Sequence, residues 1–117
     1  MTAIAQNVTM YAGDHKNLVV TVTNAAGAAV NLTGATIRWV LAKSAGSAVV
    51  VDKSTGGHGI TITPGTGGVF TVALVPADTE GLLGVYYHEA SVVDTLSNVI
   101  TVLTGAMAIE PSAIREP

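Results

Sequence analysis

Apolar and polar residues alternate with a period of two along almost the whole chain. In Asn17–Asn24, for example, Leu18, Val20 and Val22 fall on one face, and the residues between them fall on the other. This period matches a β-strand, whose successive side chains point to opposite faces, and Val, Ile and Thr favour that conformation. Further segments of this kind are separated by clusters of Gly, Asn, Asp and Pro. The approximate strand ranges are 4–11, 17–24, 35–43, 47–55, 59–63, 68–75, 84–94 and 98–110.

Only one short segment has a helical pattern. Pro76 is followed by the acidic residues Asp78 and Glu80, which favours a helical turn near residues 76–83. About seven to nine strands without intervening helices predict an all-β antiparallel sandwich or barrel. The 117 residues fit a single domain over 1–117. We expect its core to span about residues 11–110, with flexible or docking termini.

The single tryptophan lies in the middle of the strand predicted at 35–43, in a chain with only 4% aromatic residues. Trp39 shares a face with Ile37 and Leu41, and a buried Trp removes up to about 250 Å² from water. In the strand at 84–94 we expect Tyr86 and His88 to face the core, and Tyr87 and Glu89 to be exposed. The predicted core comprises Trp39, Ile37, Leu41, Phe70 and Tyr86.

Charge and hydropathy exclude two kinds of partner. The net charge is −3 and the five basic residues are spread along the chain, whereas binding to nucleic acid needs clustered Lys and Arg. No apolar run reaches the roughly 20 residues that cross a bilayer, so we expect no membrane partner. The first ten residues lack the basic and apolar regions of a secretory signal, so we expect no export by that route.

The residues that carry chemistry are few and scattered. The chain has no cysteine, which excludes a thiol nucleophile and a Cys-based zinc site, and it has no G-x-S-x-G motif. The three histidines lie far apart in the sequence, without metal-ligand spacing. We expect His15 and His58 in exposed turns and His88 as a hydrogen-bonded strand residue. The sequence therefore predicts no enzyme, no metal site and no cofactor.

Two glycine clusters, Gly56–Gly59 and Gly65–Gly68, could be mistaken for phosphate-binding loops. Such a loop leads from a strand into a helix, whereas each of these clusters precedes another strand. We therefore interpret both as hairpin connections, in which glycine supplies a positive φ.

The low charge also bears on how the protein would attach to a partner. Charged residues make up only 11% of the chain, so attachment should rely on apolar contacts and on pairing along an open sheet edge. The strand at 47–55 is the candidate, because Val49, Val50 and Val51 would otherwise face solvent. These three residues form the predicted docking edge.

The order of motifs is more specific than any one of them. Gly13-Asp14 precedes a strand, a small turn at 24–27 follows, and "NLTGAT" (31–36) leads into the strand centred on Trp39. "GGVFTVALVPADTEGLL" (67–83) and "GVYYHEASVVD" (84–94) come later. This ordered set resembles the immunoglobulin-like domain at the N-terminus of bacteriophage baseplate upper proteins and in related tail and virion proteins.

The resemblance implies an immunoglobulin-like β-sandwich with a non-enzymatic, structural role in a tailed-phage virion that is assembled in the host cytoplasm. The partners would be other virion proteins, in the baseplate or tail or on the capsid surface as a decoration, and the chain would be a homo-oligomer in the particle. The alternative is a host-receptor or carbohydrate-binding module, for which Tyr11, Tyr86 and Tyr87 would supply the aromatic contacts.

Overall fold

A computed structural model describes residues 4–62 and 65–111. Within these ranges it contains nine strands and one helical turn. The predicted strands are found within a few residues of their expected ends, except that the first is split in two, and the turn predicted at 76–83 covers only its first half. The elements are β1 (Ile4–Ala5), β2 (Val8–Tyr11), β3 (Lys16–Thr21), β4 (Thr36–Ala42), β5 (Val49–Ser54), β6 (Ile60–Ile62), β7 (Val69–Leu74), α1 (Pro76–Thr79), β8 (Gly84–Val93) and β9 (Val99–Glu110).

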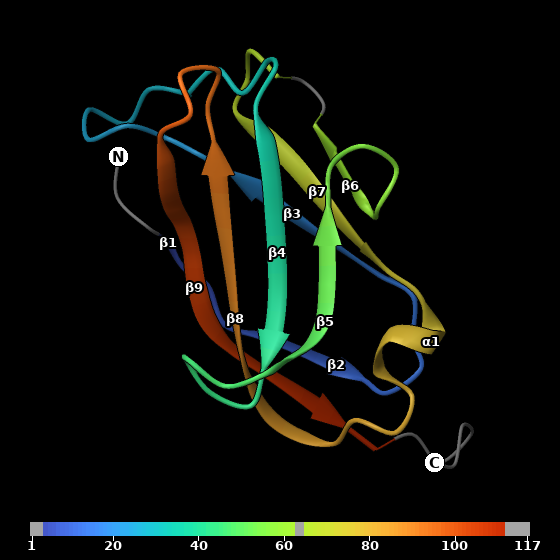
Figure 1. The fold of residues 1–117 in the computed structure, drawn as a ribbon. Coiled ribbons are helices and arrows are strands. Elements are labelled where there is room, and N and C mark those ends of the chain that lie inside the picture. The colour runs from blue at the N-terminus through green and yellow to red at the C-terminus, as the bar shows by residue number, and fades with distance from the viewer. Residues whose placement is uncertain (1–3, 63–64, 112–117) are drawn as a thin grey trace.

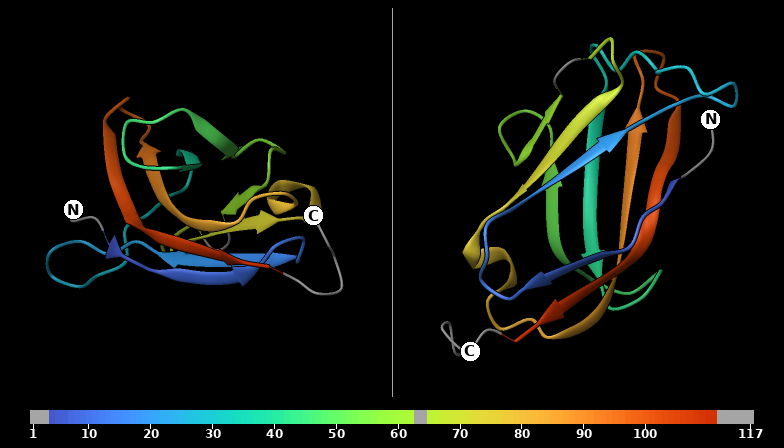
Figure 2. Two further views of the ribbon diagram at one scale, coloured as in Figure 1. Left: turned by 90° about the horizontal axis from the view of Figure 1, so that it is seen from below. Right: turned by 180° about the vertical axis from the view of Figure 1, so that it is seen from behind.

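The strands form two sheets that pack face to face (Figures 1 and 2). The larger sheet has the order β1-β9-β8-β4-β5, with β2 also paired to β9, and the smaller sheet has the order β3-β7-β6. In the larger sheet the neighbours β9, β8 and β4 correspond to the G, F and C strands of an immunoglobulin-like sandwich, and β5 adds one strand beside β4. The predicted all-β, immunoglobulin-like sandwich is therefore confirmed.

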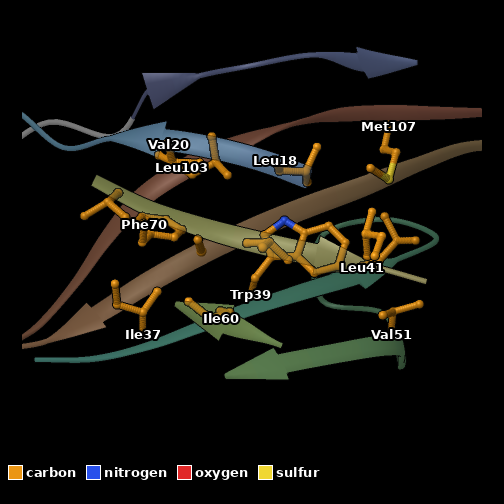
Figure 3. Close-up of a cluster of buried hydrophobic side chains, with 14 of the residues drawn as sticks. Leu18, Val20, Ile37, Trp39, Leu41, Val51, Ile60, Phe70, Leu103 and Met107 are labelled. Carbon is orange, nitrogen blue, oxygen red and sulfur yellow. The ribbon is translucent and has the colours of Figure 1, made fainter. Parts of the chain in front are cut away.

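The core lies between the sheets and follows the period-two alternation. Trp39 is in the middle of the buried cluster (Figure 3), with a relative exposure of 0%. All five residues predicted for the core are buried, including Tyr86 at 5% exposure. The cluster includes side chains from both sheets, such as Leu41 of β4 in the larger sheet and Leu18 of β3 in the smaller sheet. Burial of these faces against each other is the main favourable contribution to folding.

The N-terminal strand differs from its prediction. It is split into β1 and β2, which both pair with β9 in a parallel direction, whereas every other strand pair is antiparallel. The break is at Gln6-Asn7, where the Gln6 N–H donates to the Thr104 carbonyl (2.9 Å) and Asn7 Oδ1 accepts from the Ala106 N–H (3.0 Å). Because Met10 is buried at 5% exposure, the core begins before residue 11.

The expectation of flexible or docking termini concerns mainly residues 1–3 and 112–117, which lie outside the described residues. Residues 4–11 fall within the described part, and there the chain is paired with β9 rather than free.

Of the two glycine clusters, Gly65–Gly68 forms the predicted hairpin connection and Gly56–Gly59 does not. Gly65–Gly68 lies between β6 and β7, which form an antiparallel hairpin as expected. Gly68 has a φ of 71°, and a Cβ there would approach the Val22 carbonyl oxygen to 2.6 Å. Gly56–Gly59, however, is not a hairpin, because it carries the chain from β5 in the larger sheet to β6 in the smaller one. The alternation identifies a strand, but it does not show which sheet the strand joins.

Candidate docking edge

Strand β5 is the outer strand of the larger sheet. It pairs with β4 through registers such as Leu41 with Val51 and Trp39 with Lys53. On its other side the described residues supply only one isolated bridge, between Ser54 and Gly59. Figure 1 shows β5 at the margin of the sheet, next to β4. The prediction that this segment forms a sheet edge is therefore in agreement with the strand order.

Two hydrogen bonds fix which backbone groups of β5 point outward. The Thr55 N–H donates to the Ile37 carbonyl of β4 (3.0 Å), and the Ser54 N–H donates away from β4 to the His58 carbonyl (3.1 Å). Because N–H directions alternate along a strand, the N–H of Asp52 points outward like that of Ser54. The register shift after Leu41 pairs Ala42 with Val49 and leaves Val50 without a partner in β4. The backbone groups of Asp52 therefore point outward, and Val50 has no register partner in β4.

The side chains of the predicted docking edge do not all face solvent. Val49 and Val50 are exposed at 43% and 46%, but Val51 is buried at 7% exposure and belongs to the core. The prediction for Val51 is wrong because this residue lies opposite Leu41 on the inward face. Val49 and Val50 are both exposed because the bulge adds one residue and shifts the alternation by one position.

Two ion pairs involve residues in the second half of β5, and only that of Lys53 points inward. Lys53 lies opposite Trp39, and its Nζ is 2.8 Å from Asp78 Oδ2 in α1, with both side chains largely buried. On the outer face, Arg38 donates two hydrogen bonds to Asp52 at 3.0 and 2.7 Å, and these bonds lower the pKa of the Asp52 carboxyl. Charged residues that point inward from an edge strand oppose pairing with a foreign strand. The open part of the edge is therefore Val49–Asp52.

The tyrosines proposed for carbohydrate recognition are mostly unavailable. Tyr86 is buried, and Tyr87 is half-buried, with its hydroxyl donating to Glu89 Oε1 at 2.7 Å. This hydrogen bond raises the pKa of Tyr87. Both Tyr87 and Glu89 are half-buried, whereas we expected them to be exposed. Tyr11, by contrast, is 56% exposed.

The histidines occupy three separate environments. His15 and His58 are exposed, and His88 is completely buried. His88 Nδ1 accepts from the Trp39 indole N–H (3.0 Å), and its Nε2 donates to the Gln6 carbonyl (2.6 Å). Since Trp can only donate, these bonds define a neutral imidazole with its hydrogen on Nε2. Burial lowers the pKa of His88. Sequence analysis predicted a hydrogen-bonded His88 but not its partners.

The described residues contain no group of three or more His, Cys, Asp or Glu side chains placed to hold a metal ion. None of the helices in the described part of the chain is both long enough and apolar enough to span a membrane.

Together, the strand order and the open edge define an immunoglobulin-like β-sandwich module. No protein-family model matches the chain, and no curated protein matches it in sequence. Among solved structures it is similar to CopC from Methylosinus trichosporium OB3b, with a TM-score of 0.51 and 16% sequence identity. The similarity covers 90% of this chain and 84% of the CopC chain. At this identity the likeness supports the fold alone.

Proposed function

We propose that this chain is a non-enzymatic docking module of a tailed-phage virion, and that it attaches to other virion proteins through Val49–Asp52 of β5. The observation that carries the docking role is the open edge itself. Val49 and Val50 expose apolar side chains, Val50 has no register partner in β4, and the N–H of Asp52 points away from β4. The virion setting rests on the sequence resemblance to baseplate upper proteins.

Physical reasons favour strand pairing over charge attraction at this edge. An added strand would satisfy the outward backbone groups and cover the two valines. The four residues span about 13 Å, so each copy contributes a short contact. Repeated copies on a particle compensate for that shortness, because the second and later contacts form at high effective concentration. Exposed ion pairs add only about 0–1 kcal/mol each.

Substitutions at Val50 separate what the backbone contributes to docking from what the side chain contributes. Val50→Pro removes a backbone N–H at a position that has no register partner in β4, so the variant should fold but detach from purified virions that carry the protein. Val50→Thr is the matched control, since it keeps the N–H and a similar shape. We expect Val50→Thr to remain bound, and near-ultraviolet circular dichroism of both variants would report whether the environment of Trp39 is intact.

Salt provides a second measurement on the same particles. Raising the ionic strength from about 0.1 M to about 1 M shortens the Debye length from about 10 Å to about 3 Å. Attachment by strand pairing should survive this change. Retention of folded Val50→Pro, or release of the wild-type protein by salt alone, would contradict docking through β5.

The alternative, a host-receptor or carbohydrate-binding module, is favoured by one observation. Tyr11 is exposed and lines a hollow of about 200 Å³ together with His15, Lys16 and Glu110, and sugar rings often pack on exposed aromatic side chains between polar groups. Binding to a glycan array that disappears in Tyr11→Ala would support this function. The same variant should remain on the virion if β5 is the docking edge.

A further inference from the structure

The hairpin between β8 and β9 carries an exposed apolar tip. Leu96 is 81% exposed, and Val99 at the start of β9 is 70% exposed. In Figure 1 this hairpin connects the upper ends of the two strands. Single exposed apolar residues are common on protein surfaces. Whether these two residues could form a binding contact therefore depends on the conformation of the tip.

The tip is held rigid by one carboxylate. Asp94 Oδ1 accepts hydrogen bonds from the N–H groups of Leu96 and Asn98, both at 2.9 Å, and Asp94 Oδ2 accepts from Asn98 Nδ2 at 3.1 Å. Ser97 has a φ of 67° and is the one non-glycine residue with positive φ in the described part of the chain. A loop that is fixed in this way loses little conformational entropy when it binds. Leu96 is therefore presented on a preorganised turn.

A shallow, open hollow lies at the other end of the same sheet. It has a volume of about 310 Å³ and is formed by the β4–β5 connection, the start of β8 and the middle of β9. Val85 on its wall is 66% exposed. Figure 1 shows the β4–β5 connection and the start of β8 at the lower end, opposite the β8–β9 hairpin. The hollow is lined mainly by Lys43, Ala45, Val85, Tyr87, Gly105 and Ala106.

We propose that Leu96 of one copy inserts into this hollow on a second copy, so that the copies associate head to tail. The apolar tip and the mainly apolar hollow are complementary in chemistry. Their charges also match, because the tip carries Asp94 and the hollow carries Lys43. The two surfaces are different parts of the molecule, so the contact is heterologous and generates a ring or a filament rather than a closed two-fold dimer.

This contact uses neither Val49 nor Val50, and it is therefore independent of the proposed role of β5. A lipid surface is a poorer occupant for the tip, because residues 94–99 contain no Lys or Arg and one or two apolar side chains give only weak membrane binding.

The experiment is sedimentation velocity of the whole chain at concentrations up to about 1 mM, the range of weak contacts. Leu96→Asp should weaken self-association by about 10- to 100-fold, the factor that corresponds to exposing one buried leucine. Val85→Asp should weaken it similarly from the side of the hollow. Val19→Asp is the control, because Val19 is 58% exposed on β3 in the other sheet, and it should associate like the wild-type protein.

Mixing the two defective variants provides the sharpest result. Leu96→Asp keeps an intact hollow and Val85→Asp keeps an intact tip, so an equimolar mixture should form one-to-one dimers that grow no further. A two-fold interface would not be restored in this way. Near-ultraviolet circular dichroism would establish that both variants are folded.

Three results would overturn the proposal. They are a wild-type protein that stays monomeric throughout this range, undiminished association of Leu96→Asp, and a mixture that fails to form dimers. If Val50→Pro abolishes self-association and Leu96→Asp does not, the copies meet at β5 and the head-to-tail contact is wrong.

Discussion

Below neutral pH, the buried His88 should make the folded protein less stable. Its Nδ1 accepts from Trp39 and its Nε2 donates to Gln6, so the neutral form satisfies both partners. A proton on Nδ1 would face the Trp39 N–H, which is also a donor. Burial lowers the pKa of His88, and therefore the unfolded chain binds this proton more readily than the folded one. The stabilisation is complete above the unfolded pKa and is lost as pH falls towards the folded pKa.

The loss of unfolding free energy can be calculated because one proton, that of His88, binds more readily to the unfolded chain than to the folded one. An unfolded His has a pKa of about 6.5, and each pH unit below it corresponds to about 1.36 kcal/mol. The free energy of unfolding should therefore be lower at pH 5 than at pH 7.5, by at most about 2 kcal/mol, the limit for a His side chain that stays neutral in the folded state. Because a domain of this kind is stable by only about 5–15 kcal/mol, urea denaturation should resolve the change. Work above pH 5 also avoids most of the titration of Asp52 and Asp94, whose pKa values are lowered.

The matched variant is His88→Gln. The glutamine amide offers one acceptor for Trp39 and one donor for Gln6, without a titrating group. Its unfolding free energy should be nearly constant between pH 7.5 and 5, whereas a variant with both His15 and His58 changed to Gln should follow the wild-type curve. The reasoning is refuted if the wild-type protein loses less than about 0.5 kcal/mol over this range, or if His88→Gln shows the same loss.

Three further changes test other parts of the fold. Trp39→Ala should lower the unfolding free energy by about 3–5 kcal/mol in chemical denaturation, and a loss below about 1 kcal/mol would contradict its place in the core. Arg38→Ala should lower it by only about 0–1 kcal/mol in the same assay, because the Arg38 and Asp52 side chains are 57% and 49% exposed. Gly105→Ala should displace the N-terminal strand, because its Cβ would overlap the Gln6 carbonyl oxygen, and faster hydrogen exchange of the Gln6 amide would report it.

The inward-facing residues could be predicted from the sequence because alternation fixes the face of a strand. Leu18, Val20, Ile37 and Leu41 are all buried as their positions indicate. Val51 follows the alternation, since it lies opposite Leu41, and the prediction for it was wrong because it treated three consecutive valines as facing the same way. Alternation carries no information about the bulge that leaves both Val49 and Val50 exposed. Nor does it specify pairing partners, so the parallel contacts of β1 and β2 with β9 were not foreseen.

The bond between His88 and Trp39 depends on register. Trp39 lies opposite Ala90 and Leu41 lies opposite His88, so the two rings meet diagonally across β4 and β8, with centroids 6.0 Å apart. The sequence shows that Trp39 and His88 both face inward. It does not show how far β4 is shifted along β8, because this register is set by the loops and by packing against the second sheet.

The parallel attachment of the N-terminal strand has a consequence for the order of folding. Asn7 and Ala106, which form a hydrogen bond, are 99 positions apart in the chain, and β2 has no other strand partner in the described structure. Contacts of such long range slow folding to the millisecond-to-second range. During synthesis residues 4–11 are made before their partner strand, so they cannot be placed until β9 has left the ribosome. Between that moment and the pairing of the two strands, both β2 and its site on β9 are open, and two nascent chains held close together can exchange this strand.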